Sequence, residues 1–101
     1  MSAGSARPAA ESIAAAVLEC PLVVRLGGGG VGEPATYLPG RRITGVAVRD
    51  ETVEVSVVGT VGATAADLDD QVRRAVLPLV GERQLHVAFA DIETPAESPP
   101  S

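Results

Sequence analysis

The stretch ITGVAVRDETVEVSVVGTVG, residues Ile43–Gly62, decides the fold that the sequence predicts. Its second part alternates valines with mostly polar residues: Val53, Val55 and Val57 against Glu54, Ser56 and Val58. Its first part alternates in the same way: Thr44, Val46 and Val48 against Ile43, Gly45 and Ala47. A period of two is typical of strands that bury one face. Because Asp50 and Glu51 separate the two parts, the sequence predicts a tight β-hairpin that turns there.

An alanine-rich helix is predicted before this hairpin, from about Pro8 to Glu19. Pro21 should end it, because proline lacks an N–H group and disfavours a helical residue before it. Leu22–Leu26 then reads as a short strand or an extended packing segment. The buried face of the helix comprises Ile13, Val17 and Cys20, with Ala16 beside them.

A second helix is predicted after the hairpin, from about Ala65 to Leu77. Thr64 is a suitable N-cap residue, and Pro78 should stop or kink the helix. Its buried stripe is predicted to be Leu68, Val72, Ala75, Val76 and Leu79. Two ion pairs at a spacing of four residues are expected on its surface, Asp69–Arg73 and Asp70–Arg74. A last strand, Gln84–Ile92, places Leu85, Val87 and Phe89 on one face and His86, Ala88, Ala90 and Ile92 on the opposite face.

The predicted fold class is α+β, a single small domain with the order α-β-β-α-β. The helical crossover makes the last two strands parallel, so the sheet is three-stranded and mixed, with helices packed on it. The domain spans residues 9–92, between disordered tails at 1–8 and 93–101. Residues 27–41 are rich in Gly and Pro, and they are predicted to form a long loop without a regular element.

Composition excludes several classes of function. The 101 residues carry a formal net charge of −5, which argues against a nucleic-acid or anionic-lipid surface, because such a surface needs a basic footprint. One cysteine excludes an internal disulfide and fits a reducing cytoplasm. No apolar run approaches the roughly 20 residues that span a bilayer, and the first residues lack a signal-peptide pattern. The sequence predicts a cytoplasmic protein that reaches the membrane only through a partner.

The candidate chemical motifs are weak. Gly27–Gly32 matches G-x-G-x-x-G, but Glu33 and Pro34 follow where a dinucleotide site needs a helix N-terminus. Cys20 reads as a small core residue rather than a nucleophile. His86 is the only histidine and has no metal-ligand partner nearby in the sequence. We therefore predict no catalytic residue, no cofactor and no metal site.

An interaction surface is predicted instead. Arg41 and Arg42, with Tyr37 and Arg25, form a basic contact site at the mouth of the loop or a solvated start to a strand. The sheet face away from the second helix carries small, mostly apolar residues, which a free-standing domain seldom leaves in water. Self-association, a membrane-anchored partner or the first helix could cover it. The predicted surface comprises Tyr37, Arg41, Arg42, Ile43, Ala47, Val58, His86, Ala88 and Ala90.

The sequence resembles the alkaline shock protein family, the envelope-stress proteins of Gram-positive bacteria. The matching segments are IAAAVLECPLVVRL, YLPGRRITGVAV, VEVSVV, VGATAADLDDQVRRAVLPLV and QLHVAFADI, within about residues 10–92. The resemblance implies a non-enzymatic protein without a cofactor that self-associates, is recruited to the membrane by a separate anchor, and supports cell-envelope homeostasis under stress. The long glycine run and the short chain depart from the family pattern.

Two other functions stay open. A BON-like module that associates with lipid or the envelope shares the α-β-β-α-β order, although such modules usually belong to exported proteins. A KH-like nucleic-acid module needs a GxxG loop between two helices and a basic surface. Gly59–Gly62 has that spacing but falls between a strand and a helix.

Overall fold

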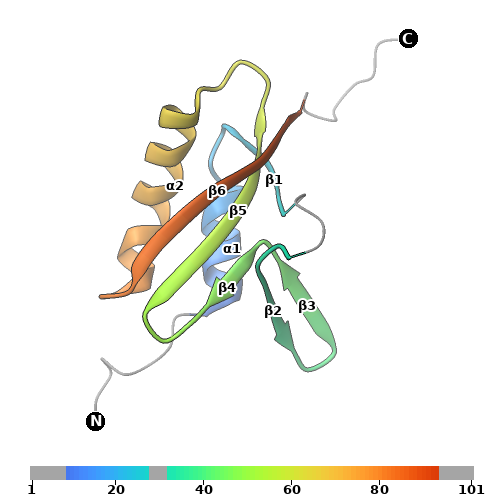
Figure 1. The fold of residues 1–101 in the computed structure, drawn as a ribbon, viewed down its shortest axis with the longest axis vertical. Coiled ribbons are helices and arrows are strands. Elements are labelled where there is room, and N and C mark those ends of the chain that lie inside the picture. Colours follow the sequence, from blue (N-terminus) through green and yellow to red (C-terminus); the bar gives the residue numbers. More distant parts are fainter. Residues whose placement is uncertain (1–8, 28–31, 94–101) are drawn as a thin grey trace.

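The computed structural model describes residues 9–27 and 32–93, and the α+β class is confirmed. The described elements are α1 (Ala10–Leu18), β1 (Val23–Leu26), β2 (Ala35–Leu38), β3 (Arg41–Thr44), β4 (Val46–Val48), β5 (Thr52–Thr60), α2 (Ala65–Val80) and β6 (Gln84–Glu93), as Figure 1 shows. The predicted order α-β-β-α-β is wrong, because five strands rather than two lie between the helices. The predicted tails at 1–8 and 93–101 lie outside the described residues, apart from Glu93, which ends β6.

The central strand of the sheet is β5, in the middle of the stretch that decides the fold. β6 pairs with it in parallel along one edge, from Thr52 to Thr60. Its other edge is shared end to end by two antiparallel strands, β4 along Val53–Val55 and β1 along Val57–Gly59. The main sheet therefore has four strands rather than the predicted three. The parallel pairing of the last two strands is confirmed.

The predicted hairpin is present as β4 and β5. Its turn is Asp50-Glu51, because the Arg49 N–H donates to the Thr52 carbonyl across 2.8 Å. The Arg49 guanidinium also lies 3.3 Å from the Glu54 carboxylate on the facing strand. The Glu51 carbonyl accepts from the Gln84 N–H at 2.9 Å, so the turn also fixes the start of β6.

Gly45 divides the first predicted strand into β3 and β4. Its φ of +90° and its close contact with the end of β1 suit only glycine, since an added Cβ would lie 2.6 Å from the Gly27 nitrogen. The interruption shifts the alternation by one residue. Ile43 therefore joins Val46 in the core, and its predicted place on the opposite sheet face is wrong.

Both helices pack on one face of the main sheet (Figure 1). The core between them is built of aliphatic side chains, with valines from β4 and β5 and an apolar stripe from each helix. Its members that are less than 2 % exposed include Ile13, Val17, Val46, Val53, Val55, Val57, Leu68, Val72, Val76 and Val80. The buried face of the first helix is as predicted. The alternative that this helix covers the opposite sheet face is wrong.

α2 begins where the sequence predicts and ends later. The Thr64 hydroxyl accepts from the Asp67 N–H at 3.0 Å, which confirms the N-cap. The helix does not stop at Pro78, which removes one intrahelical hydrogen bond and is followed by only two further helical residues. The helix continues to Val80, which is buried in place of Leu79, a residue that is 38 % exposed. Both predicted ion pairs are present, at 2.8 and 3.1 Å.

Thr64→Ala should lower the free energy of unfolding by about 1 kcal/mol, because it removes the side-chain acceptor at the N-cap. Thr64→Ser, which keeps a hydroxyl, should change it by much less. Urea denaturation followed by circular dichroism measures both. Equal stabilities of the two variants would contradict the capping role.

A β-bulge changes the register of β6. Val57 pairs with Phe89, but Val58 pairs with Asp91, so Ala90 is an extra residue. Ile92 then pairs with Gly59 on the helix side, where its Cδ1 lies 3.2 Å from the position of a Gly59 Cβ. Its predicted place on the opposite face is therefore wrong.

Candidate functional site

A second hairpin, β2 and β3, carries the exposed part of the predicted interaction surface. Leu38 pairs with Arg41, so Pro39 and Gly40 form the turn. Proline followed by a glycine with a φ of +79° is typical of a type II turn. The prediction that residues 27–41 hold no regular element is wrong. Residues 28–31 of the glycine run lie outside the described residues.

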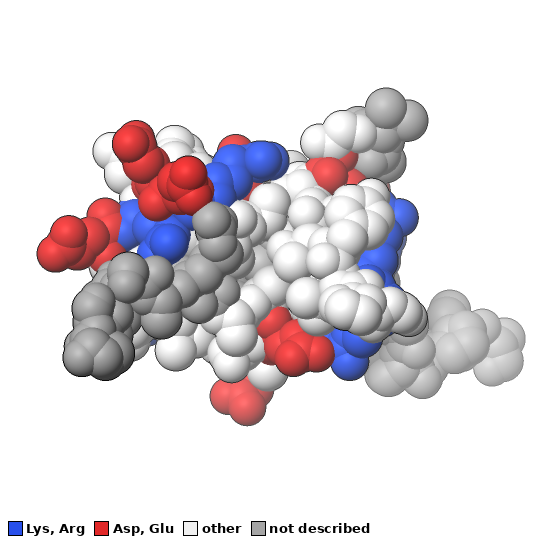
Figure 2. Space-filling model, turned by 90° about the horizontal axis from the view of Figure 1, so that it is seen from below, with Lys and Arg blue, Asp and Glu red and all other residues white. Residues whose placement is uncertain are grey.

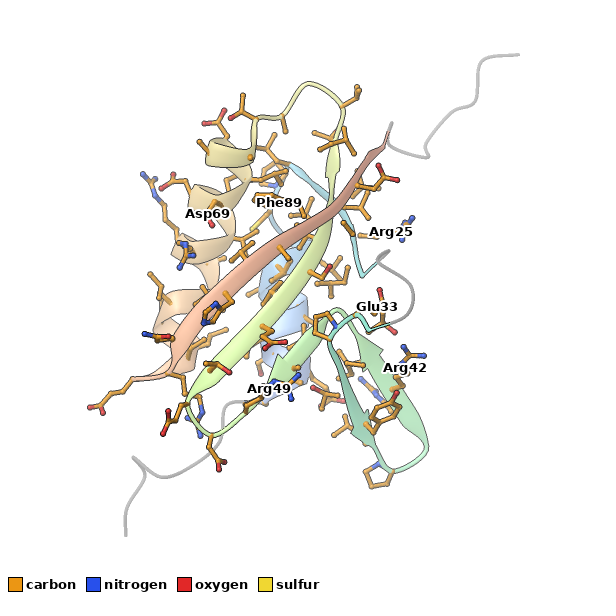
Figure 3. All side chains as sticks on the ribbon, in the orientation of Figure 1. Arg25, Glu33, Arg42, Arg49, Asp69 and Phe89 are labelled. Carbon is orange, nitrogen blue, oxygen red and sulfur yellow. The ribbon has the colours of Figure 1, made fainter. Side chains whose placement is uncertain are left out.

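Tyr37 and Arg42 are cross-strand neighbours in this hairpin. The Arg42 guanidinium lies over the Tyr37 ring, 5.7 Å from its centroid, which is a cation–π arrangement. Tyr37 is 74 % exposed, so the ring has a large area available for contact. The Arg42 guanidinium also lies 3.7 Å from the carboxylate of Glu33. Figure 3 shows these two side chains near each other.

The hairpin is fixed to the main domain by three kinds of contact. At its base, Ile43 is buried in the core. The Thr36 hydroxyl donates to the Val46 carbonyl at 2.6 Å, which joins β2 to β4. The Arg41 guanidinium lies 2.7 Å from the carboxylate of Glu11 on α1. The Tyr37–Arg42 pair therefore lies on a hairpin that contacts with the main sheet and with α1 hold in place.

The structure divides the predicted surface into three groups. Tyr37, Arg41 and Arg42 are all exposed on the β2–β3 hairpin, but Arg41 pairs with Leu38 on the face opposite the Tyr37–Arg42 pair. His86 and Ala88 are exposed on β6, and Ala90 is half-buried beside them. Three other members are at most 8 % exposed and present little surface to a partner, namely Ile43, Ala47 and Val58. Ala47→Arg is therefore expected to disturb folding, and it would not report on association.

The arginines of the hairpin lie close to carboxylates. On the face that Figure 2 shows, arginine and acidic side chains occur on both sides of a central uncharged area. Each hairpin arginine has a carboxylate within 4 Å, from Glu11 for Arg41 and from Glu33 for Arg42. The surface therefore offers an aromatic ring and partly neutralised arginines rather than a basic patch.

Cys20 lies at the end of α1, where it faces α2. Its thiol contacts the backbone carbonyls of Ala16 and Gln71 at 3.7 and 3.6 Å, and the residue is 7 % exposed. Burial, and secondarily the charge of Glu19, raises the pKa of this thiol above its ordinary value. A raised pKa keeps the thiol protonated, which suits a packing residue and opposes nucleophilic chemistry.

Labelling of Cys20 by iodoacetamide at pH 8 should be at least about tenfold slower in the folded protein than in urea, because burial limits both thiolate formation and access. A time course followed by mass spectrometry measures the two rates. Equal rates would show that the thiol is accessible and would restore a chemical role for it.

The glycine motifs do not lead to a helix N-terminus of the kind that binds phosphate. After Gly32, the next described element is β2. Gly59 belongs to β5 and lies against Leu68, whose Cδ1 would clash with an added Cβ. The Gly59–Gly62 spacing therefore does not form an exposed GxxG loop between two helices. Within residues 9–27 and 32–93, no three His, Cys, Asp or Glu side chains are grouped so that they could hold a metal ion.

No helix among the described residues is both long and apolar enough to cross a bilayer. Comparison with known proteins assigns no family: no family model, no curated protein and no solved structure matches the chain.

Proposed function

We propose that this chain is a non-enzymatic association domain of the alkaline shock type. In this proposal it acts in the cytoplasm, is recruited to the membrane by an anchored protein, and supports cell-envelope homeostasis under stress. The observation that carries the proposal is the exposed Tyr37–Arg42 pair on the β2–β3 hairpin. The resemblance in sequence supplies the biological setting.

The chemistry of the hairpin suits contact with a protein. Tyrosine and arginine are enriched among the residues that dominate binding energy at protein interfaces. Tyr37 presents most of its ring to solvent, and the stacked Arg42 already has a defined orientation. A supported pair of this kind loses little conformational freedom on binding, so more of the contact energy appears as affinity.

The charge distribution favours a protein partner over a lipid or nucleic-acid surface. The chain has a net charge of −5, and the hairpin arginines lie beside carboxylates. Binding to phosphate-rich surfaces needs uncompensated basic groups. We therefore place a BON-like lipid module and a KH-like nucleic-acid module behind the protein-docking function.

The test is a pull-down from separate membrane and cytosolic fractions with tagged protein. The wild type should capture a membrane-anchored protein, identified by mass spectrometry. Tyr37→Ala with Arg42→Ala should reduce this capture by about tenfold, as expected for the loss of dominant contact residues. Arg74→Ala is the matched control, because Arg74 is an exposed arginine with its own ion pair on α2.

Recovery of nucleic acid or a small metabolite in place of a protein would overturn the proposed function. Equal capture by the hairpin variant and the Arg74→Ala control would show that the hairpin is not the docking surface. Circular dichroism of each variant serves as the control for folding.

A further inference from the structure

β6 has an open edge. It pairs with β5 along one side, and among the described residues no strand pairs with its other side (Figure 1). At ten residues it is the longest strand in the described structure. The N–H and C=O groups on a free strand edge form a template for pairing with another chain.

Hydrogen bonds at the start of β6 show which backbone groups face outward. The Gln84 N–H donates to Glu51 in the turn before β5, so Gln84 faces inward. The next carbonyl, that of Leu85, accepts from the Arg73 guanidinium at 3.1 Å and faces outward. Because these directions alternate along a strand, the N–H and C=O groups of Val87 and Phe89 also face outward.

The open stretch is short and has two defined ends. At one end, the Arg73 side chain occupies the Leu85 carbonyl and is itself held by Asp69 at 2.8 Å. At the other end, the bulge at Ala90 interrupts the regular edge. Val87–Phe89 lies between them, with its outward groups placed symmetrically about Ala88.

We propose that two copies of this chain pair through Val87–Phe89, antiparallel about a two-fold axis at Ala88. Val87 of each copy then lies opposite Phe89 of the other, and each such pair exchanges two N–H···O bonds. The two four-stranded sheets become one continuous sheet. This inference goes beyond the proposed function, because it adds a second copy of the chain as a partner, at a surface distinct from the β2–β3 hairpin.

The side chains of β6 are complementary under this symmetry. On the helix side, Val87 meets Phe89 twice, and both are half-buried residues packed against the core. Figure 3 shows Phe89 on β6 beside α2. Aromatic and β-branched side chains are favourable cross-strand neighbours. On the other side, Ala88 meets its own copy at the axis, where a small side chain allows close approach of the backbones.

The charges of β6 also fit a second copy. On the face away from the helices, the exposed His86 of one copy lies opposite the Ala90–Asp91 bulge of the other. An imidazole can donate a hydrogen bond to a carboxylate, and this contact forms twice. The nearby surface of α2 is balanced by its Asp69–Arg73 and Asp70–Arg74 pairs, so the net negative charge of the chain does not concentrate beside the edge.

Disulfide trapping tests the symmetry directly. In a non-hydrogen-bonded antiparallel pair the Cα atoms are about 4.5 Å apart, which is compatible with a disulfide. Ala88→Cys should therefore form a covalent dimer on mild oxidation. His86→Cys is the matched control, because His86 is also exposed on β6. The proposed axis places the Cα atoms of the two residues 86 about 13 Å apart, beyond the reach of a disulfide. The wild type, which has only Cys20, shows how much covalent dimer forms through that thiol alone.

Sedimentation equilibrium measures the non-covalent dimer. Val87→Pro removes an outward N–H without removing a hydrogen bond to β5, so it should weaken the dimer at least about tenfold while circular dichroism is unchanged. His86→Asp, which places like charges opposite each other, should also weaken it. If the Val87→Pro variant unfolds, two other measurements decide the result: disulfide trapping of Ala88→Cys and the dimer affinity of His86→Asp.

Rapid trapping of Ala88→Cys, with little trapping of His86→Cys, would support the proposal. A wild type that stays monomeric at about 1 mM would overturn it. A dimer that resists Val87→Pro and His86→Asp and does not trap through Ala88→Cys would also overturn it. Either result would leave the proposed function standing, because the anchored partner docks on the β2–β3 hairpin and not on β6.

Discussion

Val55→Asp should unfold the domain. Val55 is 1 % exposed in the middle of β5, where it contributes to the core under both helices. A carboxylate there has no partner, and burying one costs several kcal/mol against a total stability of about 5–15 kcal/mol. We expect loss of the cooperative thermal transition by circular dichroism.

The matched control for this variant is Val61→Asp. It makes the same substitution just beyond β5, at a residue that is 62 % exposed. Its thermal midpoint should remain within a few degrees of the wild type. A midpoint for Val55→Asp close to that of the control would contradict the placement of Val55 in the core.

Gly45→Ala should be the most damaging single methyl addition among the glycines with positive φ. The φ of +90° is strained for alanine, and the new Cβ would lie 2.6 Å from the backbone nitrogen of Gly27. Backbone strain and overpacking each cost about 1–3 kcal/mol. The thermal midpoint should fall by at least about 8 °C, since the two costs sum to at least about 2 kcal/mol and about 1 kcal/mol corresponds to 4–8 °C in a domain of this size.

Gly40→Ala is the control that separates the two costs. Gly40 also has a positive φ, of +79°, but an added Cβ would meet nothing within 4 Å. This variant should show the strain alone and lose only about 1–2 kcal/mol. Equal losses in the two glycine variants would show that the junction of β1 and β4 is less tight than the structure indicates.

The sequence was most informative where the alternation was long and regular. Val53, Val55 and Val57 predicted the central strand and its buried face, and the Asp50-Glu51 turn followed from the matching run before it. The parallel pairing of β6 followed from the helix between the strands. The stripe of α2 was predicted apart from its end, where Val80 rather than Leu79 is buried.

The errors come from single residues that shift a register. Gly45 moves Ile43 into the core, and the bulge at Ala90 moves Ile92 to the helix side. Neither shift changes which residues the strand contains. A prediction that assigns every second residue to the same sheet face therefore does not detect it. An isolated glycine inside a strand pattern was nevertheless a signal for the first of them.

The candidate site was predicted in part. Tyr37, Arg41 and Arg42 were selected for their chemistry, but the hairpin that presents them was missed among the glycines of residues 27–41. The Pro39-Gly40 pair is a turn signal with a known mechanism, and it lies between two short runs with strand-forming residues. The open edge of β6 could not be predicted, because strand order depends on contacts between distant segments.

Photo-crosslinking in the living cell tests the central claim, that this is a protein-docking domain, most directly. A photoreactive phenylalanine analogue in place of Tyr37 keeps an aromatic ring at the exposed position, and the same analogue in place of Arg74 is the control on α2. We expect position 37, and not position 74, to form a specific adduct with a membrane-anchored protein. Adducts with nucleic acid, or equal yields of protein adduct at the two positions, would contradict it.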